Sequence, residues 1–190
     1  RVFKLNILSF IINFSKIGYA APGIVIAIGV ISPSIFLDKQ INQFFSYFGK
    51  DIGLILSGSI TILIFSYLVR FLSVAFNPIE SGLEKVSEKI DYSALNLGAN
   101  KQTLLFKIHL PMIISSCLIA FLLIFIDILK ELPITLILRP FNYNTLSVLT
   151  FEYASSEQLS QAALPALLIT IIGLLPLLFI YKILNYREGK

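Results

Sequence analysis

Four long runs of the chain contain no Asp, Glu, Lys or Arg. Each run is long enough to cross the hydrocarbon core of a bilayer as a helix, which takes roughly 20 predominantly apolar residues. The runs are Ile17–Leu37, Ile52–Val69, Ile108–Ile126 and Gln158–Tyr181. Allowing for apolar residues at their ends, we predict membrane-spanning helices over about residues 17–37, 52–76, 111–129 and 159–181. The pattern therefore predicts an all-α integral membrane domain of four helices over residues 17–190.

One long polar stretch, Asn77–Pro111, separates the second run from the third and has the pattern of two short helices. Asn77 and Pro78 suit the cap and first position of a helix, and Glu80 suits the acidic position of a capping box. Gly98 is expected to end this helix, because glycine enters the left-handed conformation at little steric cost. The apolar residues between follow helical spacing: Ile79, Leu83, Val86, Ile90, Ala94 and Leu97.

The second half of this stretch predicts another short helix and a turn into the membrane. Asn100 can cap a helix from Lys101 to about Ile108, and Pro111 marks the start of the third span. A helix–turn–helix between two spans lies at the membrane interface. It is well suited to docking a partner.

Composition supports the membrane class. The chain is 56% hydrophobic with 14% charged residues and a mean hydropathy of +0.85, whereas soluble domains carry about a quarter charged residues. A soluble helical bundle would have to bury all four runs completely, and this alternative is disfavoured. The net charge of +4 is spread between the spans and gives no indication of nucleic-acid binding.

Basic residues are distributed unevenly between the two sides of the predicted bundle. Eleven of the fifteen Lys and Arg residues lie before the first span, in the stretch 70–107 or after the last span. The positive-inside rule then places both termini and the loop 77–111 in the cytoplasm. Residues 1–16 carry a polar stripe on an otherwise apolar pattern and predict an amphipathic lead-in along the cytoplasmic surface. The segment 141–163 is predicted to hold a short helix on the opposite side.

Charged residues gather where the third span ends. Asp127 and Lys130 are three positions apart and can pair on one helical face. Glu131 and Arg139 bracket an apolar segment that starts with a proline and can fold back toward a pore mouth. Charges at the edge of a span either reach the headgroups or serve function. Two interpretations stay open: a gate or pathway lining, and a salt-bridged external loop.

Several kinds of chemistry find little support in the sequence. The chain has one cysteine and one histidine, Cys117 and His109, with no further residues at metal-ligand spacing, so no metal site is predicted. Gly49-Lys50 lacks the other residues of a phosphate-binding loop, so any ATP hydrolysis must come from a partner. An intramembrane enzyme using Asp127, Glu131 and His109 is an alternative. The charge count, however, places His109 and Glu131 at opposite membrane faces.

The polar stretch also carries a family resemblance. Ala94, Gly98, Ile108, Leu110 and Pro111 match in register the EAA motif of ATP-binding-cassette importer permeases, in which Glu-Ala-Ala and a later Gly precede Ile, any residue and Leu-Pro. Two residues depart from that motif, since Tyr92 replaces its Glu and Ser93 replaces its first Ala. The resemblance implies that this loop, with Asp91 and Ala99 included, docks in a groove of a cytoplasmic ATPase. Asp91 is a candidate replacement for the missing charge.

Further blocks narrow the resemblance to the ferric-iron type of these permeases. They are Gly18–Ala20 with Pro22-Gly23, Arg70–Leu72, Asn77-Pro78, Lys130–Pro133, Thr135-Leu136, Leu138–Phe141, Asn144–Leu146, Ala162–Leu167 and Gly173–Pro176. Permeases of this type are similar to tandem proteins of two fused halves, so the chain is expected to correspond to most of a second half, the C-terminal part of a longer protein.

The resemblance implies a bacterial inner-membrane subunit without enzymatic activity or bound cofactor. Its expected partners are a cytoplasmic ATPase dimer that hydrolyses ATP, a periplasmic ferric-binding protein, another permease half and the lipid bilayer. Import of another cargo, such as thiamine, a phosphonate or an oxyanion, is the main alternative. A structural membrane anchor is a further one, although an anchor would not need the spacing from Gly98 to Pro111.

Overall fold

The computed structural model describes residue 15 and residues 18–188, and every regular element within this part of the chain is helical. The long helices are α2 (Gly23–Ser46), α3 (Ile60–Glu84), α6 (Leu110–Leu129) and α9 (Leu159–Glu188). The short ones are α4 (Glu88–Asn96), α5 (Lys101–Thr103), the π-helix η1 (Leu104–His109), α7 (Pro133–Leu138) and α8 (Leu146–Ser155). Four helices are long and apolar enough to cross a membrane. The predicted all-α membrane fold is confirmed.

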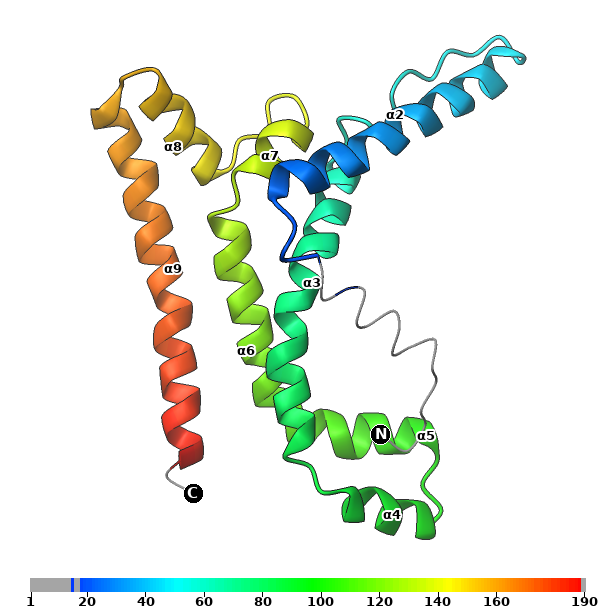
Figure 1. Cartoon of the computed structure of the whole chain (residues 1–190), viewed down its shortest axis with the longest axis vertical. Helices are drawn as coiled ribbons and strands as arrows, with labels where there is room; N and C mark the ends of the chain where they lie inside the picture. The colour runs from blue at the N-terminus through cyan, green and yellow to red at the C-terminus, as the bar shows by residue number, and fades with distance from the viewer. Residues whose placement is uncertain (1–14, 16–17, 189–190) are drawn as a thin grey trace.

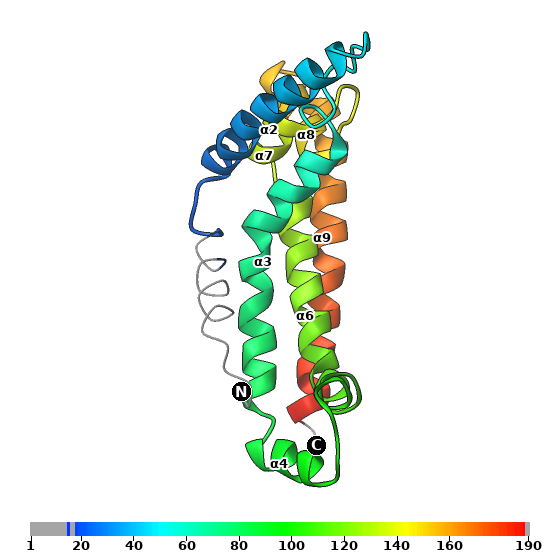
Figure 2. The same ribbon diagram turned by 90° about the vertical axis from the view of Figure 1, so that its right-hand side faces the viewer.

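Three of the long helices, α3, α6 and α9, run side by side along the long axis of the molecule (Figures 1 and 2). At one end, which we call the α4 end, α4, α5 and η1 form a layer across the helix axes (Figure 1). At the other end, the α7 end, α7 and α8 cap the bundle and α2 crosses it obliquely (Figure 1). The largest cluster of buried apolar residues joins α2, α3 and α7: Ile26, Ala27, Ile62, Leu63, Ile134 and Leu138. The core therefore holds the α7 end together.

Two predicted span limits are wrong, and Asp38 explains both. Helix α2 runs to Ser46, beyond the expected end at residue 37, because the Asp38 carboxylate is buried and fully hydrogen-bonded. It accepts backbone N–H groups from Ile55, Leu56 and Ser57 at 3.2, 2.9 and 2.7 Å, and the Ser57 hydroxyl at 2.6 Å. These bonds hold residues 52–59 in a loop, so the second span begins at Ile60 and not at residue 52.

The predicted helix start at Asn77 and Pro78 is also wrong. Helix α3 continues through both residues to Glu84, and the break falls at residues 85–87. Ser87 caps α4, its side chain accepting the Lys89 N–H at 3.3 Å. Proline inside a membrane helix is tolerated because neighbouring groups can satisfy the freed carbonyl, which is why Pro78 gave a false signal.

The remaining predicted elements agree more closely with the structure. The third span ends at Leu129 as expected, and α8 supplies the short helix predicted within residues 141–163. Helix α9 continues to Glu188, past the expected limit at residue 181. The predicted lead-in over residues 1–16 lies outside the described residues apart from Ser15.

Candidate functional site

A fixed turn joins α4 to α5 at the α4 end. Gly98 has a φ of +83°, as the sequence predicted, and the backbone closes α4 through two hydrogen bonds. The Ala99 N–H donates to the Ala94 carbonyl and the Gly98 N–H to the Leu95 carbonyl, each at 3.0 Å. This pattern is a Schellman C-cap. Asn100 then caps the next helix as predicted, since its side chain accepts the Thr103 N–H at 2.8 Å.

A buried hydrogen bond joins α4 to η1. The Nε2 atom of His109 lies 2.8 Å from Oδ1 of Asp91, and Asp91 is only 1% exposed. Because the oxygen belongs to a carboxylate, the ring nitrogen is the donor. Asp91 therefore faces inward and is not a free surface charge that could replace the Glu of the EAA motif. This pairing could not be predicted from local spacing, because the two residues are 18 positions apart.

The other residues of the predicted coupling loop differ in exposure. Ala94 of α4 is buried, and Ala99 and Ile108 are half-buried. Leu110 and Pro111 are exposed. Large apolar side chains point outward from the same end, with Leu97 at 89% exposure. We call the set of four exposed side chains Tyr92, Leu97, Leu105 and Phe106 the α4 patch. Several large apolar side chains exposed at one end of a molecule suit an interaction surface.

The chain bends sharply between η1 and α6. Figures 1 and 2 show the α5–η1 segment lying across the axis of α6, although the three elements follow one another without a break. Pro111 lies at the start of α6, and a proline beside a π-helix is an ordinary cause of such a bend. The turn predicted at Pro111 is thus present.

The charged residues near the end of α6 form separate pairs. Asp127 and Lys130 are 2.9 Å apart, as the sequence predicted. Arg139 pairs with Glu152 of α8 at 2.6 Å and with Asn144, so it joins α7 to α8. Glu131 and Arg139 are not brought together.

Glu131 instead pairs with Arg70 at the α7 end of the bundle. Its Oε1 atom lies 3.4 Å from Nη1 of Arg70 and accepts the Ile134 N–H at 3.1 Å, which caps α7. Glu131 is 6% exposed. Arg70 lies near the middle of α3, so Glu131 compensates its charge within the bundle. Gly23 packs against the pair, and a Cβ there would collide with the guanidinium.

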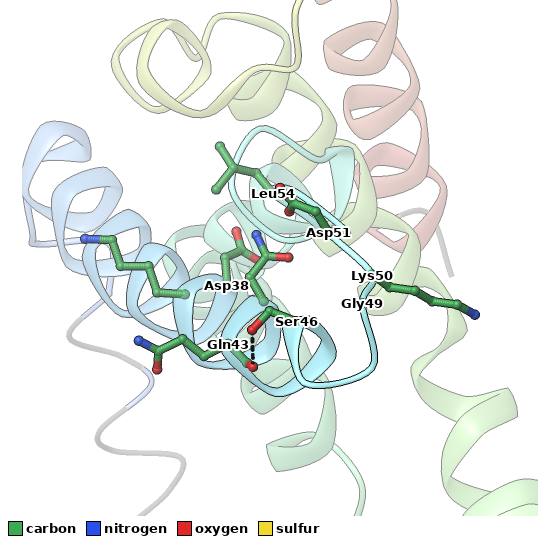
Figure 3. A pocket seen from close by; sticks show the side chains of 9 residues that line it. Asp38, Gln43, Ser46, Gly49, Lys50, Asp51 and Leu54 are labelled. Atoms are coloured by element: carbon green, nitrogen blue, oxygen red, sulfur yellow. Dashed lines mark hydrogen bonds between the residues drawn. The ribbon is translucent and has the colours of Figure 1, made fainter.

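An open hollow of about 510 Å³ lies between the far part of α2 and the α2–α3 connection (Figure 3). Its lining is Asp38, Lys39, Asn42, Gln43, Ser46, Gly49, Lys50, Asp51 and Leu54. The Asp38 carboxylate is already used by the loop backbone, and the Ser46 hydroxyl donates to the Gln43 carbonyl at 2.7 Å. The polar groups of Asp38 and Ser46 thus stabilise the local fold. The hollow therefore offers no set of unbonded polar groups that point to one centre.

The structure does not bring together the residues of the intramembrane-enzyme alternative. The described residues contain no group of three or more His, Cys, Asp or Glu side chains that could hold a metal ion. His109 and Glu131 lie at opposite ends of α6, which at 20 residues separates them by about 30 Å. The two side chains therefore cannot act on one reacting group.

Comparison with known proteins shows a family and a relative that this chain resembles. A family model described as binding-protein-dependent transport system inner membrane component matches residues 6–189. The chain is similar to the Fe(3+)-transport system permease protein FbpB 2 of Haemophilus influenzae, with 27% identity over 164 residues. This alignment covers 86% of the chain and 29% of that relative. The chain thus spans less than a third of the length of the relative it matches.

Proposed function

This chain belongs to the family of binding-protein-dependent transport system inner membrane components, and on that premise we propose that it forms membrane-spanning part of an ATP-binding-cassette importer for ferric iron. Its four apolar helices make it a multi-pass inner-membrane protein. A transport family of this kind works with an ATPase and a binding protein. The specific partners of this chain are a cytoplasmic ATPase dimer, a periplasmic ferric-binding protein and another permease half.

The observation that carries the proposal is the construction of the α4 end. The Gly98 turn fixes the exit of α4, and the Asp91–His109 pair holds α4 against η1, which continues into α6. A partner that displaces the α4 patch therefore also displaces α6, because the Asp91–His109 bond and η1 connect the two. This is what an importer needs, because ATP-driven motion outside the membrane must move helices within it.

Orientation follows from the charge distribution. Most basic residues lie on the side of the α4 end, so that end and both termini face the cytoplasm, where an ATPase can reach the α4 patch. The α7 end then faces the periplasm and the binding protein. On this side Asp127, Lys130, Glu131 and Arg139 are the candidate gate residues. The buried Glu131 is the strongest of them, because a charge held within a bundle is retained for function more often than for stability.

Ferric iron is the proposed cargo because the relative named for Fe(3+) transport aligns with most of the chain. The chain itself needs no cofactor for this role, since the partner subunit hydrolyses ATP. Thiamine, a phosphonate or an oxyanion are the competing cargoes. A transported ion only passes through, so the absence of a strong metal site among the described residues is compatible with iron as cargo.

The test is uptake of labelled ferric iron by cells that lack the whole permease and regain it intact, as Gly98→Trp or as Gly98→Asn. No described atom lies within 4 Å of a Cβ built at Gly98, although the φ of +83° strains any L side chain there, so tryptophan adds to that strain a bulk that blocks a docked partner. Asn tolerates the left-handed conformation and is the matched control. Intact protein and Gly98→Asn should restore uptake, and Gly98→Trp should fail at equal membrane levels. If the intact protein restores uptake of another solute and not of iron, the assignment of ferric iron as the cargo is wrong.

A further inference from the structure

Helix α3 carries a continuous polar face through the membrane. Its polar side chains recur at steps of four, three, four and four residues, which places them on one side of the helix. They are Ser66, Arg70, Ser73, Asn77 and Ser81. Three of them, Arg70, Asn77 and Ser81, carry groups that lipid tails cannot satisfy. The EAA motif lies outside α3, and the Asp91–His109 pair joins α4 to η1. Neither feature explains why α3 carries these polar residues.

The opposite side of α3 is apolar and exposed. Ile64, Phe65, Leu68 and Leu72 all point outward there as large exposed side chains. This side therefore suits contact with lipid. The contrast between the two sides shows that α3 is amphipathic along its length, and a membrane-spanning helix with a polar face turns that face away from lipid.

The polar face is closed at the α7 end. The Arg70–Glu131 pair spans from α3 to the α6–α7 connection at 3.4 Å, with Gly23 of α2 against it. Nearby, the Tyr67 hydroxyl bonds the Thr135 hydroxyl at 2.5 Å and ties α3 to α7. These contacts join three elements at one level. The Nε atom of Arg70 is buried there without a hydrogen-bond partner, so the pair is not fully satisfied and is suited to opening.

Below this closure the polar face borders a hollow of about 570 Å³. Its lining includes Tyr19, Ser73, Asn77 and Ser81, with Val74, Pro78 and Leu123. Asn77 and Ser81 are exposed in this hollow. Leaving such groups against hydrocarbon costs several kcal/mol each, so the hollow must hold water or polar protein. Its volume is room for many water molecules at about 30 Å³ each.

We propose that the polar face of α3 lines a water-filled route for the cargo, and that the Arg70–Glu131 pair closes this route at the α7 end. The inference rests on the proposed transport function, but it concerns the path and not the identity of the solute. A hydrated cation that prefers oxygen ligands can make several weak contacts with hydroxyl and amide groups at successive helical turns. Weak contacts of this kind suit transport, because an ion bound tightly at one site would not leave it.

The route can be tested by cysteine labelling of the whole importer in membranes. In a background with Cys117→Ala and other cysteines removed, Ser73→Cys, Asn77→Cys and Ser81→Cys are exposed to a charged methanethiosulfonate reagent. Leu68→Cys and Leu72→Cys, on the lipid side of the same helix, are the matched controls. Because the thiolate forms only in water, the polar-face variants should react at least about tenfold faster. Equal rates on both faces, or no reaction on the polar face, overturn the water-filled route.

The closure has its own test in the same membranes. With reagent applied only from the α7 side, Ser73→Cys should be protected while the pair is intact. Adding Glu131→Gln should expose it, whereas Glu152→Gln, which breaks a different pair at the same end, should not. If Glu131→Gln leaves the labelling rate unchanged, or Glu152→Gln raises it equally, the Arg70–Glu131 pair is not the closure.

Failure of this inference and failure of the proposed function give different results. Labelling needs no cargo, so a polar face that reacts in a protein that imports another solute supports the route and overturns only iron as cargo. An unreactive polar face in a protein that does restore iron uptake overturns the route and leaves the importer assignment intact.

Discussion

Breaking the Asp91–His109 pair should loosen α4 without unfolding the bundle. The pair is the buried polar link between α4 and η1, at 2.8 Å with Asp91 1% exposed. A hydrogen bond to a charged group contributes about 1.5–3 kcal/mol. Asp91→Ala should cost about this much in the local opening of α4, since the rest of the fold has its core at the other end. Asp91→Asn keeps an acceptor oxygen and should cost less.

Amide hydrogen exchange at α4 measures this opening in the whole importer. The expected loss corresponds to exchange about 10- to 100-fold faster at α4 in Asp91→Ala, because each 1.4 kcal/mol is a factor of ten. Glu88→Ala, an exposed acidic position in the first turn of the same helix, is the control and should change exchange little. In parallel, solute moved per ATP hydrolysed should fall in Asp91→Ala, because the docked helix no longer transmits motion to α6.

A double-mutant cycle decides whether loss of the Asp91–His109 contact causes the faster amide exchange at α4. If Asp91→Ala and His109→Ala act through one contact, the double variant should be about as loose as either single variant. Full additivity of the two effects, or unchanged exchange at α4 in Asp91→Ala, would refute the reasoning.

Three further substitutions test the packing. Gly23→Ala should push the Arg70 guanidinium away from its partner and reduce uptake, measured against Gly29→Ala, whose Cβ would meet nothing within 4 Å. Gly82→Ala brings a Cβ within 2.7 Å of the Ser116 Cβ and should cost about 1–3 kcal/mol; Ser116→Gly should restore thermal stability if the clash is the cause. Asp38→Ala leaves three part-buried N–H groups without their acceptor, which costs at most about 1–3 kcal/mol each, so proteolysis should become faster at the 52–59 loop, and an unchanged rate would contradict that role.

Features that depend on neighbouring residues were accessible from the sequence. The apolar runs predict four membrane-crossing helices, because the bilayer sets their length and lipid requires internal hydrogen bonding. The turn at Gly98, the cap at Asn100 and the Asp127–Lys130 pair also follow from local spacing. In each case the interacting groups lie within a few residues of one another, so the local sequence pattern is enough to predict the interaction.

Features that depend on distant residues were not accessible. Asp38 was interpreted as the end of a helix because a charge usually leaves the membrane, yet three backbone N–H groups from another segment compensate it. Arg70 directly follows a run without charged residues, and Glu131 compensates it from 61 positions away. Asp91 is the third case, because its place in the sequence does not show that His109, 18 positions away, bonds to it. Charge compensation across the fold decides all three cases, and helical spacing carries no information about it.

The central claim is that the α4 patch docks an ATP-hydrolysing subunit, and site-specific photo-crosslinking tests it most directly. A photoreactive amino acid at Leu97, which is 89% exposed at the α4 end, is compared in cells with one at Phe141, 94% exposed at the α7 end. The account predicts a crosslink to the ATPase from Leu97 and none from Phe141. An ATPase crosslink from Phe141, or none from Leu97 in a protein that still restores uptake, would contradict it.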